Sequence, residues 1–277
     1  MKKQHSLKRR LLLLSGVAAI MCTSCIFIPP KEEVEVLKKD NLTLVWQDTF
    51  DDYTGAPDPS KWTYQTGHGK NGWGNNELQN YLDNTNEAKT AIVKDGVLTI
   101  KAYKEGNEWK SARLNSIQSW KYGYIEARMK ITDRAGAWPA FWMMPENRSD
   151  WPKCGEIDIM ENAPATAGLH RVFSTLHAEG HSGGAGQKIG EQKFKNNLFS
   201  EWHTFGVKWS KEKITAYYDD IAVGSYDSDG TITNWPYDQK FYIILNLAIG
   251  GNLGGDNYVD NLNGQAEFLI DYVRVYQ

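Results

Sequence analysis

The chain has 277 residues, with 31 Lys and Arg against 34 Asp and Glu, and a formal net charge of −3. The basic residues are scattered rather than gathered into a stripe, so we expect no nucleic-acid partner. The chain also carries 11 Trp and 14 Tyr, a heavy aromatic load. Flat rings pack well against the apolar faces of sugars, and the composition therefore weakly favours a carbohydrate ligand, although many such rings are ordinary sheet residues.

The N-terminus reads MKKQHSLKRRLLLLSGVAAIMCTSC, with a basic start, an apolar segment and small residues before a cysteine. The apolar segment is short for a membrane-spanning helix, so the pattern predicts an export signal over residues 1–24. The run CTSC resembles a bacterial lipobox, which implies lipidation of Cys25 and an exported lipoprotein held at the outer membrane or cell surface. Ordinary secretion and a retained signal anchor are the alternatives. Residues 25–41, with a Pro-Pro pair, predict a short polar tether.

The remaining residues, 42–277, are expected to form one domain, because the chain shows no internal repeat and no second regime of composition. Of the 3 cysteines, Cys22 would leave with the signal and Cys25 would carry lipid. Only Cys154 then remains in the folded part, so no intramolecular disulfide is available to support the core. We expect a monomer.

Short runs of alternating or β-branched apolar residues recur along this domain, separated by turn residues such as Asp95-Gly96 and Gly254-Gly255. The runs are LTLVWQDTF (42–50), GVLTIKAYK (96–104), GYIEARMKI (123–131), ITAYYDD (214–220), FYIILNLAI (241–249) and FLIDYVRVY (268–276). No helix-period stretch of convincing length interrupts them. The pattern predicts an all-β fold, a sandwich of two antiparallel sheets.

The run GEIDIMEN, residues 155–162, places three carboxylates in what otherwise reads as a buried strand. Side chains alternate between the two faces of a strand, so Glu156 and Asp158 share a face while Glu161, at an odd offset, should point the other way. A β-bulge between Asp158 and Glu161 would add one residue and return Glu161 to the face of the other two. Otherwise Glu161 is a bystander.

With the bulge, the Cα atoms of Glu156 and Glu161 would lie about 13 Å apart along a flat strand. Retaining glycoside hydrolases place two carboxyl groups about 5–5.5 Å apart and inverting ones about 6.5–9.5 Å apart. The two side chains must therefore lean together over a concave cleft. Three such close carboxyl groups cannot all ionise at their usual pKa, so one proton is expected to remain near pH 7. The plain alternative is a solvated strand face, and spacing alone leaves both open.

The residues resemble a known family, glycoside hydrolase family 16, in its laminarinase-like branch. CGEIDIMEN matches the family's active-site pattern E-x-D-x-x-E in its bulged form. Further blocks match in the family's order over nearly the whole mature chain: LVWQDTF, DPSKW, GWGNNELQNYL, AWPAFWMMP, EWHTFGVKW, ILNLAIGGN and IDYVRVYQ. The resemblance implies a concanavalin-like β-jelly-roll of two curved antiparallel sheets with a concave substrate cleft, and hydrolysis of β-glucans inside the chain with retention of configuration.

The resemblance also implies roles for individual residues. Glu156 takes the nucleophile position, Glu161 the general acid/base position, and Asp158 the position that assists the nucleophile and modulates a shared proton. The substrate contacts implied are Trp138, Trp142 and Trp151 as cleft aromatics, His177 beside the scissile bond, and Asn75, Glu77 and Arg113 as glucose contacts on the non-reducing side. Each has a plain alternative: a core ring, a hydrogen bond to a neighbouring strand, or a surface ion pair.

Two segments depart from the family pattern. Family members commonly read D-E-F where this chain has Asp48-Thr49-Phe50, in a region that often helps to bind a structural calcium. Loss of the Glu weakens the expectation of calcium, for which Asp271 is a weak remaining candidate ligand. No cofactor is expected to be required for catalysis. The Gly-rich segment HAEGHSGGAGQK, residues 177–188, differs from the branch's usual loop and is expected to reshape the leaving-group side.

The predicted function is a membrane-tethered endo-β-glucanase acting on β-1,3-glucan (laminarin), on mixed-linkage β-1,3-1,4-glucan, or on both. Another family 16 specificity, such as an agarase, carrageenase or xyloglucan-active enzyme, is an alternative that the GWGNNE block disfavours. A non-catalytic glycan-binding lipoprotein on the same scaffold is the alternative from another class. A binder does not need both Glu156 and Glu161, and both are present.

Overall fold

The structure is a computed structural model, and it describes residues 35–39, 41–83, 89–147 and 150–277. The predicted export signal, the lipidation candidate Cys25 and the first part of the predicted tether lie outside these residues. None of the helices within the described ranges has the length and apolar character needed to cross a lipid bilayer.

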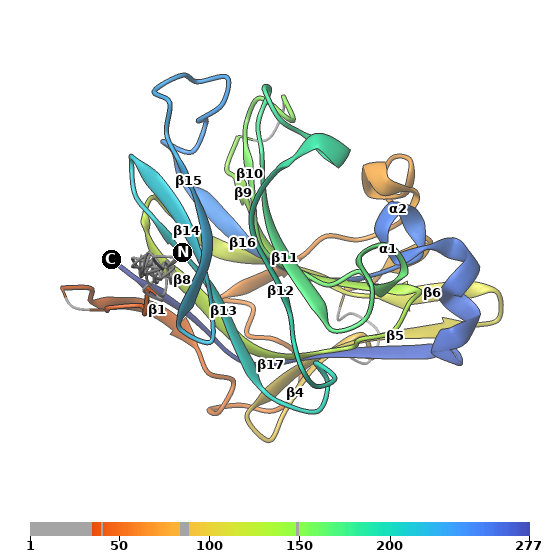
Figure 1. The fold of residues 1–277 in the computed structure, drawn as a ribbon. Coiled ribbons are helices and arrows are strands. Elements are labelled where there is room, and N and C mark those ends of the chain that lie inside the picture. Colours follow the sequence, from red (N-terminus) through yellow and green to blue (C-terminus); the bar gives the residue numbers. More distant parts are fainter. Residues whose placement is uncertain (1–34, 40, 84–88, 148–149) are drawn as a thin grey trace, which may run out of the picture. The chain divides into compact units, whose positions relative to one another are not determined.

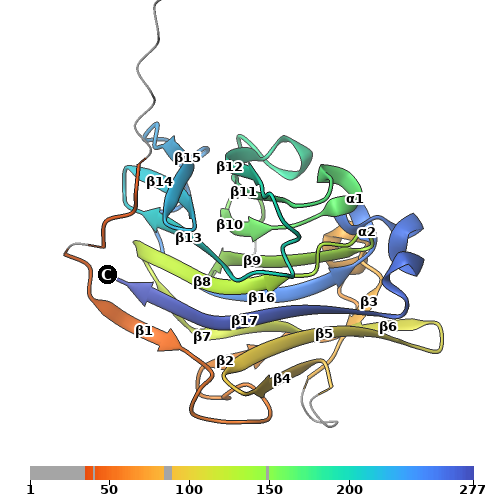
Figure 2. The same cartoon turned by 60° about the horizontal axis from the view of Figure 1, so that its bottom comes forward.

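The strands of the folded part form two sheets (Figure 1). The ten-stranded sheet runs in the order β15 (Ile221–Asp227), β14 (Lys213–Tyr218), β13 (His203–Trp209), β8 (Gly123–Ile131), β17 (Gln265–Tyr276), β5 (Val97–Glu105), β6 (Glu108–Ser111) and β3 (Gln79–Tyr81), with β1 (Leu44–Asp48) paired to β17 and β4 (Ala91–Lys94) paired to β5. Figure 2 shows the long strand β17 between β8 and β5, with β1 alongside it.

The seven-stranded sheet runs in the order β12 (Gln187–Lys193), β11 (Arg171–His177), β10 (Glu156–Glu161), β9 (Ala137–Pro145), β16 (Phe241–Ile249), β7 (Arg113–Trp120) and β2 (Trp62–Tyr64). Its strand pairs are all antiparallel, whereas β3 and β6 of the other sheet pair in parallel. The connecting helical turns are short: η1 (Gly72–Asn76), α1 (Pro164–Ala167), η3 (Gly183–Ala185), α2 (Gly251–Gly254) and η4 (Asp256–Leu262).

The core lies between the two sheets, and the alternation of residues along each strand explains it. Along β8, Ala127, Met129 and Ile131 are fully buried, while Arg128 and Lys130 point to the opposite face. The same hydrophobic cluster contains Phe141 and Met143 of β9 in the other sheet. The all-β two-sheet sandwich predicted from the sequence is therefore confirmed.

The end of the predicted tether packs against the domain. The Leu37 backbone N–H donates to the Asp220 carbonyl (2.8 Å), and the Ala222 N–H donates to the Glu35 carbonyl (2.9 Å), so this segment pairs with the start of β15. The Lys39 ammonium donates to both carboxylate oxygens of Glu126 (2.9 and 2.8 Å). Residues 35–39 therefore belong to the same compact unit as the sheets, which begins upstream of the expected boundary at residue 42.

Candidate active site

Strand β10 contains the expected bulge. On the β11 side, Asp158 lies opposite Thr175 and Glu161 lies opposite Phe173, so three steps along β10 match two along β11. On the β9 side the register shifts between Asp158 and Met160. One extra residue therefore resets the alternation, and Glu161 returns to the face that carries Glu156 and Asp158. The prediction of a bulge between Asp158 and Glu161 is confirmed.

The three acids line a cleft of about 1040 Å³ on the seven-stranded sheet. The cleft is larger than the sites of most small ligands, which suits several linked sugars. All the substrate contacts inferred from the sequence also line it: Asn75, Glu77, Arg113, Trp138, Trp142, Trp151 and His177. The turn η1 and strands β7, β9, β10 and β11 thus bring together residues that are up to about a hundred positions apart in the sequence.

Two indole groups hold the outer pair of carboxyl groups. Trp151 Nε1 donates to Glu156 Oε2 (2.7 Å), and Trp138 Nε1 donates to Glu161 Oε1 (3.0 Å). The Trp151 ring is half exposed, whereas Trp138 is buried beneath the cleft. Each indole N–H is only a donor, so it stabilises the orientation of its carboxyl group without competing for the proton.

Asp158 lies between these two acids and is almost fully buried. Its Oδ2 atom is 3.0 Å from His177 Nε2, close enough for an ion pair, but no well-directed hydrogen bond reaches this oxygen. The interaction between the two carboxyl groups helps to raise the pKa of Glu156 and opposes the rise of the pKa of Asp158. Asp158 is thus placed to take up or return a proton as the charge on Glu156 changes.

Burial raises the pKa of all three carboxyl groups. The pKa of Glu156 rises to about 8, because of burial and the neighbouring Asp158 charge, and burial raises that of Asp158 to about 7. Burial and Asp158 raise the pKa of Glu161 well above its usual range. Near neutral pH the set therefore retains protons, and the raised pKa of Glu161 suits it to act as a general acid.

On the other side of the acids, the Arg113 guanidinium is stacked between two indole rings. Its central carbon lies 4.6 Å from the ring centroid of Trp73 and 4.6 Å from that of Trp142. The Arg113 Nε–H donates to Gln65 Oε1 (2.5 Å). Cation–π contacts on both faces fix the plane of the guanidinium, so its remaining N–H groups can present a rigid set of donors to sugar hydroxyls.

A hydrogen-bonded chain supports this wall of the cleft. Trp142 Nε1 donates to Asn246 Oδ1 (2.7 Å), Asn246 Nδ2 donates to Tyr81 Oη (3.0 Å), and the Tyr81 hydroxyl donates to Glu77 Oε2 (3.1 Å). Sequence reasoning missed Trp73, Tyr81 and Asn246 as site residues. They lie in the blocks GWGNNELQNYL and ILNLAIGGN that it singled out, but no spacing tells which side chains of a block face a cleft.

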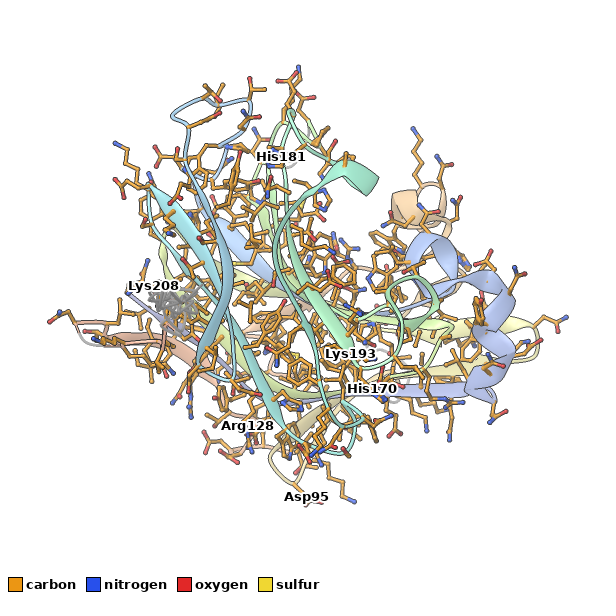
Figure 3. All side chains as sticks on the ribbon, viewed as in Figure 1. Asp95, Arg128, His170, His181, Lys193 and Lys208 are labelled. Carbon is orange, nitrogen blue, oxygen red and sulfur yellow. The ribbon has the colours of Figure 1, made fainter. Side chains whose placement is uncertain are left out.

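The calcium candidate Asp271 lies in an ion pair with Arg128. Its Oδ2 atom accepts a hydrogen bond from Arg128 Nη1 (2.7 Å), so a cationic side chain already pairs with one oxygen of this carboxylate; Arg128 is labelled in Figure 3. Asp48, in the region where the family often helps to bind the ion, accepts instead from Trp62 Nε1 (2.8 Å) and Lys61 Nζ (3.0 Å). Calcium binding at Asp271 stays a prediction, and the ion pair with Arg128 weighs against it.

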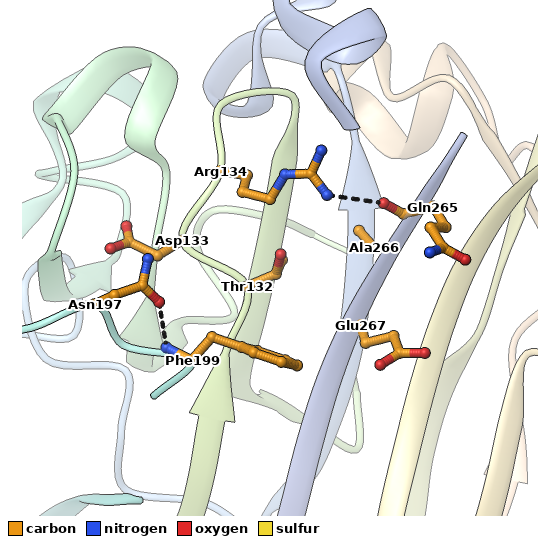
Figure 4. A pocket seen from close by; sticks show the side chains of 8 residues that line it. All are labelled: Thr132, Asp133, Arg134, Asn197, Phe199, Gln265, Ala266 and Glu267. Carbon is orange, nitrogen blue, oxygen red and sulfur yellow. Dashed lines mark hydrogen bonds between the residues drawn. The ribbon is translucent and has the colours of Figure 1, made fainter. Parts of the chain in front are cut away.

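A second, smaller hollow of about 330 Å³ lies at the ends of β8 and β17 (Figure 4). Its lining residues are Thr132, Asp133, Arg134, Asn197, Phe199, Gln265, Ala266 and Glu267, and none of these lines the cleft. Asp133 is buried there and accepts the backbone N–H of His170 (2.9 Å), which gives this acid a structural partner. The chemistry of the protein therefore centres on the larger cleft.

The fold and the site are those of a glycoside hydrolase, as comparison with known proteins shows. The chain belongs to Glycosyl hydrolases family 16, whose sequence profile matches residues 78–274. A beta-glucanase from Rhodothermus marinus is 36% identical over 255 residues, which cover 87% of either chain. The family inferred from the sequence is confirmed.

Two solved structures show the same fold. SCLam, a non-specific endo-beta-1,3(4)-glucanase of family 16, superimposes with a TM-score of 0.80 at 35% identity, covering 88% of this chain and 94% of that one. A variant of SCLam holds 1,3-beta-D-cellobiosyl-glucose at its active site. The laminarinase from a Flavobacterium species superimposes with a TM-score of 0.77 at 37% identity, covering 85% of this chain and 100% of that one. The predicted jelly-roll is confirmed.

Proposed function

We propose that the protein is a retaining endo-β-glucanase that hydrolyses β-1,3-glucan (laminarin), mixed-linkage β-1,3-1,4-glucan, or both. The observation that carries the proposal is the bulge in β10, which places Glu156, Asp158 and Glu161 on one face of a large aromatic-walled cleft. The names of the relatives, a beta-glucanase, a laminarinase and an endo-beta-1,3(4)-glucanase, support the same substrate class.

In the first step, ionised Glu156 attacks the anomeric carbon of the bound sugar while Glu161 gives its proton to the departing glycosidic oxygen. The carbon–oxygen bond breaks, and a covalent glycosyl-enzyme forms with inversion. Glu156 must be ionised when it attacks, and Asp158 can hold the proton that Glu156 gives up. The interaction between the two carboxyl groups supports this role. The His177 ring, 3.0 Å from Asp158, can balance the charge of that carboxylate.

In the second step, the same Glu161, now ionised, removes a proton from water, and the water oxygen attacks the anomeric carbon from the face that the leaving group vacated. Glu156 leaves as a carboxylate, and two inversions give net retention. Around this centre, Trp138, Trp142 and Trp151 are proposed to form the aromatic wall, while Asn75, Glu77 and Arg113 contact glucose hydroxyls on the non-reducing side.

Proton NMR of the first product tests the stereochemistry. Because two displacements restore the configuration, we expect the β-anomer of the new reducing end to appear first from laminari-oligosaccharides and to mutarotate only later. An initial α-anomer would contradict the roles given to Glu156 and Glu161. Product analysis on laminarin, barley β-glucan and cellulose would separate β-1,3 from mixed-linkage specificity. If neither laminarin nor barley β-glucan is cleaved, the proposed function is wrong.

We also propose that the enzyme is a monomeric exported lipoprotein, acylated at Cys25 and held at the outer membrane or cell surface. The basic start, the apolar segment and the CTSC run support this. In a bacterial host fed a radiolabelled or alkyne-tagged fatty acid, we expect the wild-type protein to carry the label and Cys25→Ser to lack it. Equal labelling of the two proteins would contradict acylation at this residue.

A further inference from the structure

The strand order of the seven-stranded sheet gives the cleft a direction. Strands β16 and β7 lie on one side of the pair β9–β10, and strands β11 and β12 lie on the other. The proposed glucose contacts Glu77 and Arg113 belong to the β7 side, where Arg113 is the first residue of β7. If that side binds the non-reducing part of the glucan, the departing part of the chain must lie over β11 and β12.

An aromatic ring stands at the start of this second side. Phe173 of β11 pairs with Glu161 across one strand boundary and with Glu191 of β12 across the next. Its ring is half-buried, lines the cleft and packs against a buried cluster of Ala163, Ala248 and Trp138, the last of which donates to Glu161. A flat apolar surface thus begins one strand beyond the general acid, where the first sugar of the leaving group would stack.

Three charged side chains stand beside this ring and also line the cleft. Arg171 Nη1 lies 2.8 Å from Glu191 Oε1, and Lys188 Nζ lies 2.6 Å from Glu191 Oε2. These partners hold the pKa of Glu191 below its usual range, so the acid stays ionised. The Lys188 ammonium also lies 5.9 Å from the centroid of the Phe173 ring.

Mutual pairing holds the three charged groups at defined positions and uses only part of their hydrogen-bonding capacity. An arginine offers five N–H donors and a lysine three, more than their two bonds to Glu191 require, and the carboxylate keeps free lone pairs. A neutral sugar presents hydroxyl groups that both donate and accept. Polar side chains next to a flat aromatic ring therefore suit a neutral sugar unit. An anion is favoured less, because the formal charges of Arg171, Lys188 and Glu191 sum to only +1.

We propose that Phe173, Arg171, Lys188 and Glu191 form a leaving-group subsite that determines how strongly the enzyme prefers long β-glucan chains. The first sugar beyond the cleaved bond stacks on Phe173, and the hydroxyls of that sugar or the next bond the charged cluster. This inference rests on the proposed function, because it needs Glu161 as the acid that faces the leaving group. Binding energy gained there in the transition state raises kcat/KM for long substrates alone.

The test compares two substrates that differ only beyond the cleaved bond. Laminarihexaose places sugars over β11 and β12, whereas p-nitrophenyl β-laminaribioside places there only an aryl group that does not reach β12. For Lys188→Met and Glu191→Gln, we expect kcat/KM on laminarihexaose to fall about tenfold further than kcat/KM on the aryl glycoside, as expected for the loss of one or two hydrogen bonds. We also expect the preferred cleavage position in laminarihexaose to move along the chain.

Lys193→Met is the matched control, because Lys193 is an exposed lysine at the far end of β12 from the loop that carries His181 (Figure 3). It should change the ratio of the two kcat/KM values by less than about twofold. Phe173→Leu tests the ring separately, since leucine keeps an apolar contact with Trp138 but lacks a flat face. It too should lower activity on laminarihexaose more than on the aryl glycoside.

Equal losses on the two substrates, or no loss on either, would overturn the assignment of the subsite. These outcomes are distinguishable from failure of the proposed function, because in that case the wild-type protein would itself leave laminarihexaose and the aryl glycoside intact. The side chains of Lys188 and Glu191 are 54% and 32% exposed, so folding of their variants is expected to be normal and can be checked by circular dichroism.

Discussion

Glu161→Gln and Glu156→Gln are expected to abolish hydrolysis of laminarin and barley β-glucan while the fold remains intact. Glutamine keeps the shape of the side chain and can still accept the indole N–H of Trp138 or Trp151. It can neither give up a proton to the leaving oxygen nor attack the anomeric carbon. Loss of general acid–base catalysis alone lowers kcat by about 10²–10⁴-fold, and loss of the nucleophile should cost at least as much. If either variant keeps near-wild-type turnover, the catalytic role assigned to the substituted glutamate is wrong.

Azide distinguishes the two roles. With p-nitrophenyl β-laminaribioside, whose leaving group needs no acid, Glu161→Ala still forms the glycosyl-enzyme, and azide should displace Glu156 to give the β-glycosyl azide. In Glu156→Ala, azide should attack in place of the missing nucleophile and give the α-glycosyl azide. Exchanged products would reverse the assignment. Glu179→Gln is the control, because Glu179 is an exposed acid paired with Lys153 (3.4 Å).

The same Glu161→Gln variant should be more stable than the wild type at alkaline pH. Folding raises the pKa of Glu156 and Asp158 to about 8 and about 7, and that of Glu161 well above its usual range. The folded protein therefore holds protons that the unfolded chain releases. The resulting stabilisation is complete below the unfolded pKa values, near pH 4, and is lost progressively as the pH rises toward the folded pKa values, which are about 7 for Asp158 and about 8 for Glu156.

Thermal melts between pH 4 and pH 9 would measure this effect. Glutamine is neutral in both the folded and the unfolded state, so its contribution to stability does not depend on pH. The Tm of Glu161→Gln should therefore exceed that of the wild type at pH 8 and approach it at pH 4. A Tm difference that does not depend on pH would show that the buried carboxyl group does not titrate as described. An active site that is inactivated and stabilised by one substitution illustrates the trade between stability and function.

Lys39→Met is the second change with a large expected effect, and it acts far from the cleft. Lys39 donates to both oxygens of Glu126, which is fully buried and also accepts the Tyr276 hydroxyl (3.2 Å). The ammonium lies 5.2 and 5.0 Å from the ring centroids of Tyr124 and Tyr276. Removing the cation leaves a buried carboxylate without its counter-charge, a change that costs 3–5 kcal/mol in fully buried pairs.

Lys39 itself is 38% exposed, so water screens part of the interaction and about 2 kcal/mol is expected. For a domain of this size, that loss lowers the Tm by about 4–8 °C. Lys38→Met, at the exposed neighbouring position, should have little effect. The double variant Lys39→Met/Glu126→Gln should regain part of the loss, because no unpaired charge remains. An unchanged Tm in Lys39→Met would show that the ion pair contributes nothing to stability, and no recovery in the double variant would show that the loss does not come from an unpaired charge on Glu126.

Local features of this protein followed from the sequence because their causes are local. The alternation in EARMKI is the local reason why Ala127, Met129 and Ile131 of β8 face the core, since side chains of a strand alternate between two faces. The spacing of Glu156, Asp158 and Glu161 allowed either one-face clustering by a bulge or a bystander acid, and the bulge was confirmed. The resemblance of several blocks to one family supplied the substrate class and the candidate contacts in the cleft.

Other features depended on contacts between segments far apart in the chain. The stacking of Arg113 between Trp73 and Trp142 joins three separate elements, and the pairing of Lys39 with Glu126 joins the predicted tether to the middle of a sheet. The raised pKa of Glu161 likewise depends on burial by neighbouring strands. A sequence states which groups are present and how they alternate along a strand. Only the packing of one sheet on another decides which side-chain groups are buried away from water. Burial in turn decides which charged groups need a partner.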